Sequence, residues 1–487
     1  MSEEFISLGA KLRQHAHFQP HAPAVSCGPV TVDYEALHRR TNRIARGLAA
    51  MGVKLGDLVT VGLPNGIAFV EACYAIWKLG ATPQPVSFRL PKAELEAIVE
   101  LADTPLVIAE FEHRIDRPVV TVEDLAAKSD DEGDLPDATP PVSKAPTSGG
   151  STGRPKLILA GQPGVAPKET PEIAMWQIKP DDVCVLPAPL YHNAGFGMMM
   201  TATMMGAHLV VMPRFDAEGV LAEIEARKAT WVYLVPTMMT RIWRLPEEVR
   251  TRYDVSSLHT LWHLAAPCPA WLKEAFIHWI GPSKVMELYA GTEAQAVTVI
   301  TGEEWLTHRG SVGRVTAGEM KAVGEDGRDL PPGEVGEIYM RPAEGSPPTY
   351  RYLGATAKTL PGGWESLGDI GWFDAEGYLY LADRRTDMIL VGGSNVYPAE
   401  IEAALEEHPA VQSCAVIGLP DEDLGNVVHA IVQPRAPVTP EDLKAHLADR
   451  LVTYKQPRSY EFVAEPLRDD AGKVRRSALR EARLPPA

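Results

Sequence analysis

The chain has 487 residues, of which 45% are hydrophobic. A chain of this length exceeds what one compact core usually holds, so we expect more than one domain. Its 47 Lys and Arg residues stand against 64 Asp and Glu residues, which gives a formal net charge of -17. This balance argues against a general nucleic-acid-binding protein and against binding to anionic membranes, so any anionic ligand needs a local site.

The five cysteines are scattered along the chain, with no CxxC pair and no spacing to histidines that indicates a zinc site. They are typical of buried thiols in a reducing compartment. The first 20 residues lack the basic start and apolar run of a secretion signal, and no later segment is apolar for long enough to span a bilayer. The sequence therefore predicts a cytoplasmic protein without a membrane span.

The first third of the chain alternates between helical and extended patterns. Between Asp33 and Gly52 the apolar side chains fall on one face; Asp33 is suited to an N-cap and Gly52 to a helix end. Extended segments LVTVGL, ATPQPV and PLVIAE follow, separated by a helical run that contains Trp77 and by a helix after Pro91. Strands alternating with helices favour an α/β layered sheet.

A polar stretch around residues 128–146 interrupts this pattern, and a second α/β unit follows with HLVVMP, WVYLVP, KVMELY and a helix near Trp271. Residues 311–381 then change to short strands separated by Gly and Pro, which predicts a smaller β-rich unit. The last part alternates again, with helices expected at 398–407 and around Leu443. We place a domain boundary near Asp383, which separates an N-terminal domain of residues 1–383 from a C-terminal domain of residues 384–487.

The strongest motif is a loop rich in glycine and hydroxyl groups. It consists of Thr147, Ser148, Gly149, Gly150, Ser151, Thr152, Gly153, Arg154, Pro155 and Lys156. Glycines let backbone amides approach phosphate oxygens closely, hydroxyls add donors and Lys156 adds positive charge, so the loop is suited to a polyphosphate. It does not match the GxxxxGK[ST] pattern, and a flexible surface loop is the alternative when the motif is taken alone.

Three further segments carry polar groups suited to a nucleotide. Tyr289 and Glu293 lie directly after an apolar strand, where ligand sites of open α/β sheets usually occur. The tyrosine can stack on a base, and the carboxylate can hold Mg2+ against phosphates. Asp369, in a GDIG segment, can accept from ribose hydroxyls, and Lys473 lies in AGKVR near the C-terminus. Each segment alone is also compatible with a turn, a surface charge cluster or a basic tail.

Together and in this order, these segments resemble the adenylate-forming superfamily of acyl-CoA synthetases, firefly-type luciferases and peptide-synthetase adenylation domains. The resemblance covers nearly the whole chain. It implies a large N-terminal domain of two α/β sheet subdomains plus a β-rich subdomain, with a small mobile α+β C-terminal domain. It also implies that a carboxylic acid reacts with ATP and Mg2+ to form an acyl adenylate, whose acyl group then passes to a thiol, coenzyme A.

The resemblance assigns roles to individual residues. The loop from Thr147 to Lys156 would wrap the β and γ phosphates, although Gly149 stands where the family usually has Ser or Thr. Tyr289 would stack on adenine, and Asp369 and Arg384 would hold the ribose. The remaining assignments are Ala265, Ala266, Pro267 and Ala290 in the nucleotide site, Thr292, Glu293 and Lys473 as catalytic residues, and Thr152 and Glu293 at Mg2+.

The resemblance also implies a hinge that swings the C-terminal domain between adenylation and thioester formation. The hinge maps onto Thr386 or its neighbours, where family members usually have Asp or Lys. Gly392 and Gly393 would line the channel for the pantetheine arm, because glycines leave room for a slender ligand.

The acid pocket is expected beside the segment that follows PLYH, the strand that precedes Ala-Ala-Pro and the turn at Gly291. Its candidate residues are His192, Asn193, Phe196, Met199, Trp262 and Gly291. His192 either gates the pocket or is a core histidine. Gly291 and the clustered methionines favour a large apolar acid, and the loop forms SGGSTG and AGTE look similar to those of bile-acid and terpenoid CoA ligases.

Three alternatives concern the acceptor and the chemistry. Only a short tail follows Lys473, so we expect no fused carrier domain, but a carrier protein in trans is an alternative to coenzyme A. A non-catalytic nucleotide-binding module is the alternative of another class, and the presence of Lys473, Glu293 and Asp369 argues against it. Luciferase-like oxidation requires a specialised substrate. The expected partners are small molecules, with no nucleic acid; a homodimer is also compatible with the sequence.

Overall fold

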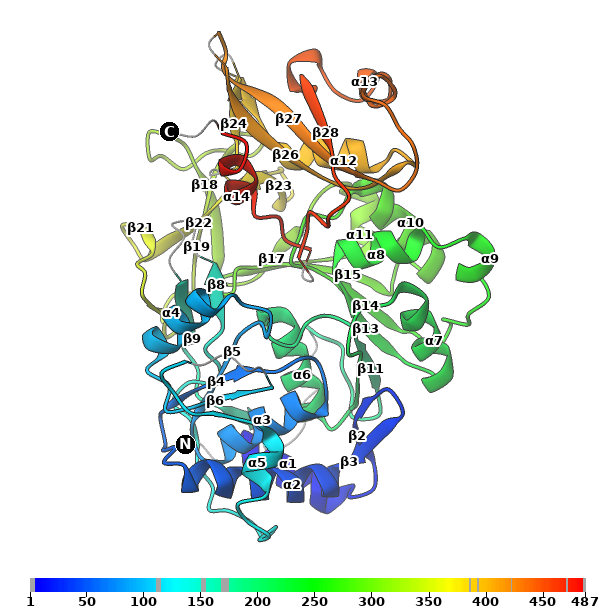
Figure 1. Cartoon of the computed structure of the whole chain (residues 1–487). Coiled ribbons are helices and arrows are strands. Elements are labelled where there is room, and N and C mark those ends of the chain that lie inside the picture. The colour runs from blue at the N-terminus through cyan, green and yellow to red at the C-terminus, as the bar shows by residue number, and fades with distance from the viewer. Residues whose placement is uncertain are drawn as a thin grey trace.

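The computed structural model describes residues 5–110, 115–149, 155–167, 175–384, 387–391, 394–421, 423–469 and 472–484. Figure 1 shows a large N-terminal part, coloured blue to yellow, with a smaller C-terminal part, coloured orange to red, at one end. The α/β architecture expected from the sequence is confirmed. No helix among these residues is long and apolar enough to cross a membrane.

The first α/β unit is a parallel sheet in the order β5-β4-β6-β7. Its strands are β4 (Leu58–Gly62), β5 (Thr82–Pro85), β6 (Val107–Ala109) and β7 (Val119–Val120), and the helices of this part of the chain are α1 (Leu8–Phe18), α2 (Tyr34–Ala50), α3 (Ile67–Lys78), α4 (Lys92–Ala102) and α5 (Val122–Ala126). The expected ends of α2 are confirmed, because the Asp33 side chain accepts a hydrogen bond from the Ala36 amide and Gly52 has a φ of 92°.

The second α/β unit and the β-rich segment form one sheet, which has 14 strands among the described residues. Its parallel part is β2 (Pro23–Cys27), β12 (His208–Val211), β11 (Val183–Leu186), β13 (Trp231–Leu234), β14 (Thr260–His263) and β15 (Val285–Tyr289). The antiparallel continuation is β16 (Val297–Thr301), β17 (Gly313–Ala317), β23 (Tyr378–Arg384), β22 (Trp364–Phe373), β19 (Gly336–Arg341) and β18 (Glu319–Val323). The β-rich unit is therefore joined edge to edge to the second sheet through β16.

The edges of this sheet carry β3 (Val30–Asp33) on β2 and β21 (Lys358–Leu360) on β22. The helices that follow its strands are α6 (Asn193–Met205), α7 (Ala217–Arg227), α8 (Pro236–Trp243), α9 (Glu247–Arg250), α10 (Ala270–Ile280) and α11 (Gly302–Thr307). A separate antiparallel sheet joins β8 (Thr147–Gly149), β9 (Pro155–Ala160) and β20 (Tyr350–Leu353), and β1 (Phe5–Ser7) pairs with β10 (Val165–Pro167). The sequence did not predict that β20 returns to the strand after the Gly-rich loop.

The C-terminal part has a hydrophobic core of its own, built from residues between Ile389 and Leu451. Its strands are β24 (Ile389–Val391), β25 (Ser394–Val396), β26 (Val411–Asp421), β27 (Gly425–Pro434) and β28 (Ser459–Phe462), and its helices are α12 (Pro398–Glu406), α13 (Pro440–Ala448) and α14 (Arg476–Glu481), with a 3-10 turn at Thr453–Lys455. The expected helices at 398–407 and around Leu443 are confirmed. A boundary near Asp383 is compatible with this separate core and stays a prediction.

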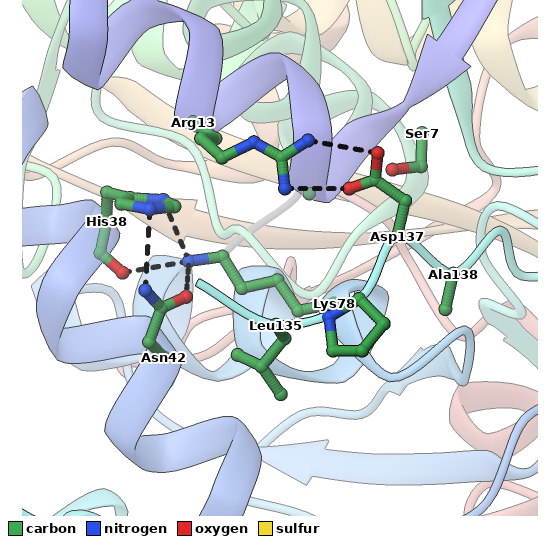
Figure 2. Close-up of a pocket in the computed structure, with 10 residues that line it drawn as sticks. Ser7, Arg13, His38, Asn42, Lys78, Leu135, Asp137 and Ala138 are labelled. Carbon is green, nitrogen blue, oxygen red and sulfur yellow. Dashed lines mark hydrogen bonds and ion pairs between the residues drawn. The ribbon is translucent and has the colours of Figure 1, made fainter. Parts of the chain in front are cut away.

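The polar stretch after residue 128 is anchored on the first unit by polar contacts. Figure 2 shows the Lys78 ammonium donating to the main-chain oxygen of His38 and to the Asn42 side chain, at 2.8 and 2.6 Å. The His38 ring contacts Asp134, and Arg13 pairs with Asp137 at 2.9 Å. Burial lowers the pKa of Lys78 well below its usual value. The stretch that interrupts the sequence pattern is therefore fixed against α1 and α2.

A glycine on α2 is required by close packing. A Cβ added to Gly47 would lie 2.1 Å from the main-chain oxygen of Leu125 in α5. Helix propensity alone favours Ala over Gly by about 1 kcal/mol. We expect Gly47→Ala to lower the thermal unfolding temperature nevertheless, because a main-chain atom cannot move aside as a flexible side chain can.

The control is Ala49→Gly at an exposed position of the same helix, where only the propensity loss of about 1 kcal/mol applies. Calorimetry measures the thermal unfolding temperature of both variants. A Gly47→Ala variant that is more stable than the parent chain would contradict the packing argument.

Candidate active site

Two of the predicted nucleotide-binding residues meet although they are far apart in the sequence. Tyr289 ends β15, and Asp369 lies within β22. The Tyr289 hydroxyl donates a hydrogen bond of 2.6 Å to Asp369 Oδ2, and the aspartate is only 8% exposed. The aromatic ring expected under a base and the carboxylate expected at a ribose therefore occupy one place in the fold. On the strand beside β22, Arg384 is the main-chain partner of Asp369, and its side chain lies outside what is described.

A second cluster surrounds the Glu293 carboxylate, which is 5% exposed. The Tyr352 hydroxyl donates to Glu293 Oε1 at 2.5 Å, and Lys156 Nζ lies 3.4 Å from the same oxygen and 3.1 Å from the Tyr352 hydroxyl. Burial and the hydrogen bond to Glu293 raise the pKa of Tyr352 far above its ordinary value, so the phenol keeps its proton and remains the donor. The cluster joins the end of β9 to the turn after β15.

Strand pairing brings these groups together. Tyr352 on β20 lies opposite Ile158 on β9, two residues beyond Lys156. β9 in turn pairs with β8, in which Ser148 is opposite Lys156 and Gly149 opposite Pro155. Five predicted loop residues, Gly150, Ser151, Thr152, Gly153 and Arg154, lie outside the described residues, as does the side chain of Ser148. Their phosphate-binding roles stay predictions.

The turn that carries Thr292 and Glu293 is closely packed. The Ala294 amide donates to the main-chain oxygen of Gly291 at 3.1 Å, and Ala294 has a φ of 53°, which is uncommon for a residue with a side chain. A Cβ on Gly291 would meet Leu367 at 2.2 Å and Glu293 Oε2 at 2.9 Å. Gly291 thus makes room for these two side chains, so it does not by itself indicate space for a large acid. Thr292 is partly buried.

The predicted catalytic lysine lies on a segment that packs against the N-terminal part. The Lys473 amide donates to Asp469 Oδ1 at 2.9 Å, and the Asp469 amide donates to the Lys473 carbonyl at 3.0 Å. A Cβ on Gly472 would lie 2.7 Å from the Thr237 hydroxyl of α8. Ala266 and Pro267 line a cavity together with Asp469, so the Ala-Ala-Pro turn and the lysine segment are neighbours.

Ala265, at the start of that turn, has a φ of 78°. A side chain in the left-handed region stores strain, which occurs most often at functional sites. Ala290 follows Tyr289 and is partly buried. Gly392, Gly393 and the proposed hinge residue Thr386 lie outside the described residues.

The acid-pocket candidates divide between two environments. Phe196 and Trp262 are fully buried; Phe196 packs against Trp77 with ring centroids 5.8 Å apart, and the Trp262 indole donates to the carbonyl of Trp176 at 3.1 Å. Met199 is also fully buried. These three side chains are part of the hydrophobic core. His192 caps the start of α6, with its ring 4.5 Å from the ring of Tyr191.

The partly exposed positions of α6 include Asn193, Gly197 and Met200. Of the residues predicted to contact the acid, Asn193 therefore has the most suitable position. The sequence reasoning missed this division because a helix that is apolar on every side shows no preferred face.

It also missed Tyr352, which lies in the segment TYRYLG. Alternating tyrosines in a strand are an available signal, since residues two apart share one face. However, a sequence does not show which strand will be the neighbour.

Comparison with known proteins agrees with this geometry. The family model described as AMP-binding enzyme matches residues 12–346, and the model described as AMP-binding enzyme C-terminal domain matches residues 400–473. The chain is 33% identical to a feruloyl-CoA synthase of an Amycolatopsis species, over 97% of this chain and 98% of that protein. It is 32% identical to a fatty acid–[acyl-carrier-protein] ligase of Streptomyces coeruleorubidus, over 96% and 94% respectively.

A solved structure shows the same fold along the whole chain. The o-succinylbenzoate CoA synthetase of Bacillus subtilis, in complex with the acyl-adenylate intermediate, superposes with a TM-score of 0.82 at 26% identity. The match covers 98% of this chain and 99% of that one.

The Tyr352 hydroxyl provides a test of the cluster around Glu293. We expect Tyr352→Phe to raise about 10-fold the Mg2+ concentration that half-saturates ATP binding, because a carboxylate that loses its orienting hydrogen bond is a poorer metal ligand. Fluorescence titration of ATP binding at increasing Mg2+ measures this. Tyr350→Phe is the matched control, because the Tyr350 hydroxyl bonds to Glu365 instead. Equal Mg2+ dependence in both variants would refute the predicted role of Tyr352.

Proposed function

The chain belongs to the AMP-binding enzyme family, and we propose that it joins a carboxylic acid to the thiol of coenzyme A through an acyl adenylate, at the expense of ATP. It is an acid–thiol ligase. Three contacts between segments that are distant in the sequence support the residue assignments. Tyr289 bonds to Asp369, Lys156 lies beside Glu293, and the Lys473 segment lies beside the Ala266 turn.

Each of these groups has a role in binding ATP. Asp369 accepts from the ribose hydroxyls, while Tyr289, held by Asp369, presents its ring to adenine. Lys156 lies beside the phosphates and neutralises part of their charge. Because the Tyr289–Asp369 bond fixes both side chains before ATP arrives, little ordering is left for the binding step.

Glu293 is suited to Mg2+. Among the described residues, no group of three His, Cys, Asp or Glu side chains converges on a metal site. A site with one carboxylate fits Mg2+, which is usually held by one or two carboxylates together with substrate phosphates and water. When bound, the ion would supply charge stabilisation at the phosphates. The protein contributes the orientation of Glu293 through Tyr352.

Lys473 serves the adenylation step. The carboxylate oxygen of the acid attacks the α-phosphorus, pyrophosphate leaves, and the negative charge that gathers in the transition state requires a cation. Lys473 is exposed on a turn fixed by Asp469 and by the contact of Gly472 with Thr237, which holds the ammonium at the edge of the site.

Replacing this cation tests the assignment. We expect Lys473→Ala to slow acid-dependent pyrophosphate release about 100-fold or more, since losing one transition-state charge contact costs that order of magnitude. The measurement uses ATP, Mg2+ and a panel of acids from short fatty acids through aryl to polycyclic acids, with and without coenzyme A. Arg475→Ala, two residues away and exposed, should retain activity. Unchanged pyrophosphate release by Lys473→Ala would remove the lysine from the mechanism.

The C-terminal domain is held in its observed pose by Arg244, which ends α8. Its guanidinium donates to the main-chain oxygens of Gln412 and Glu406 at 2.7 and 2.8 Å. We propose that this pose serves adenylation, because it places the Lys473 segment at the Ala266 turn, and that the domain moves for thioester formation.

The Arg244 contacts predict an unequal effect on the two half-reactions. Arg244→Ala should slow acyl-adenylate formation about 10-fold, as expected for the loss of hydrogen bonds from a charged donor. Transfer of the acyl group from preformed acyl adenylate to coenzyme A should change less. Single-turnover measurements of each half-reaction separate the two, with Arg252→Ala, an exposed arginine that pairs with Glu218, as the control. An equal loss in both half-reactions would contradict the proposed pose.

A carrier protein as the acceptor is the second candidate, and the 32% identity to a fatty acid–[acyl-carrier-protein] ligase favours it. Comparing thioester formation with coenzyme A and with a holo carrier protein distinguishes the two.

The bulky apolar acid remains a proposal that rests on the methionines of α6, and a preference for short acids would overturn it. We propose a cytoplasmic location from the five unpaired cysteines. A homodimer stays a prediction.

A further inference from the structure

Lys144 has a fixed main chain between two sheets. Its carbonyl accepts a hydrogen bond of 3.0 Å from the Ala160 amide at the end of β9. The flanking residues are fixed as well, because Trp77 donates to the Ser143 carbonyl at 2.8 Å and the Ala145 amide donates to the Pro83 carbonyl at 3.0 Å. The direction of the lysine side chain is therefore set by the backbone on both sides.

The side chain extends to α6. Lys144 Nζ lies 3.7 Å from the position that a Cβ on Gly197 would take. Gly197 is four residues after Asn193, so both lie on one face of α6, and both are partly buried. The absence of a side chain at Gly197 leaves space in front of the ammonium.

The ammonium has no hydrogen bond or ion pair within the part of the chain that the structure describes. The buried lysines Lys273 and Lys78 differ: Lys273 pairs with Glu287, and Lys78 donates to several oxygens. Lys144 is partly buried, and desolvation lowers its pKa to about 8. A partly buried cation without a counter-charge would be stabilised by a partner from outside the chain.

A second polar atom on the same face of α6 is also unsatisfied. Asn193 Oδ1 is buried and has no hydrogen-bond partner among the described residues. Buried polar atoms without partners are rare in folded proteins. The Lys144 ammonium is a donor and Asn193 Oδ1 is an acceptor, so a ligand carboxylate would complete the ammonium and not the amide oxygen.

We propose that Lys144 binds a second carboxylate on the acid substrate, at the end remote from the carboxylate that is activated. The inference rests on the proposed function and specifies its substrate class. Lys144 is three residues before Thr147 on β8, which spans at most about 10 Å of extended chain. β8 pairs with β9 next to Lys156, the lysine at the phosphates. An acid that extends from the adenylation site to Lys144 would carry its two carboxylates at opposite ends.

Matched pairs of acids test the proposal. Each pair contains a monocarboxylic acid and the analogue that carries a second carboxylate at its far end, in an aryl and in a straight-chain series. kcat/KM from pyrophosphate release is measured for the parent chain, Lys144→Met and Lys144→Arg. We expect the parent chain to prefer the diacid, and Lys144→Met to lose about 100-fold on the diacid with little change on the monoacid. Lys144→Arg should recover part of the loss.

Two outcomes overturn the inference. One is a parent chain that prefers the monoacid of every pair, and the other is an equal loss on both acids in Lys144→Met. Calorimetric unfolding of the variants shows whether they fold. The rate of Lys144→Met on the monoacid reports on the ligase chemistry separately from the role of Lys144. A parent chain that releases pyrophosphate with neither acid would count against the proposed function as a whole.

Discussion

The candidate site depends on one buried carboxylate, Glu293, held between a phenol and an ammonium. A carboxylate that is 5% exposed needs donors that replace the lost water, and Tyr352 and Lys156 supply them. The three residues come from the turn after β15, from β20 and from β9. Their mutual contact therefore fixes the small antiparallel sheet against the large one. If the carboxylate were placed elsewhere, the strand that follows the Gly-rich loop would lose its contact with the nucleotide site.

The charge of the whole chain makes this local arrangement necessary. With a net charge of -17, the protein repels a polyphosphate at long range, so binding relies on a few cations at short range. Lys156 belongs to the N-terminal part and Lys473 to the C-terminal part. The segment that carries Lys473 contacts Thr237 of the N-terminal part. The two cations of the candidate site therefore come from distant parts of the chain.

The sequence predicted the features that depend on local chemistry. The N-cap at Asp33, the strand before Tyr289 and the helices of the C-terminal part all follow from short patterns, and all are present. The roles of Tyr289 and Asp369 came from the family resemblance, and their hydrogen bond could not be predicted locally because 80 residues separate them. Tyr352, Arg244 and Lys144 were missed, since each acts through a partner that is distant in the chain. The face of α6 was misjudged because Phe196 and Met199 differ from Asn193 in packing, which periodicity does not reveal on an apolar helix.

In its two described hydrogen bonds, Arg244 donates to main-chain oxygens of the C-terminal domain and not to side chains. Main-chain oxygens at the end of α12 and the start of β26 keep their positions whenever the fold is kept, whatever residues the surface carries. The surface side chains of the smaller domain can therefore change during evolution while this contact with the larger domain is kept. Exchange of the C-terminal part for that of a relative would therefore keep this attachment wherever the main chain at these two oxygens follows the same course.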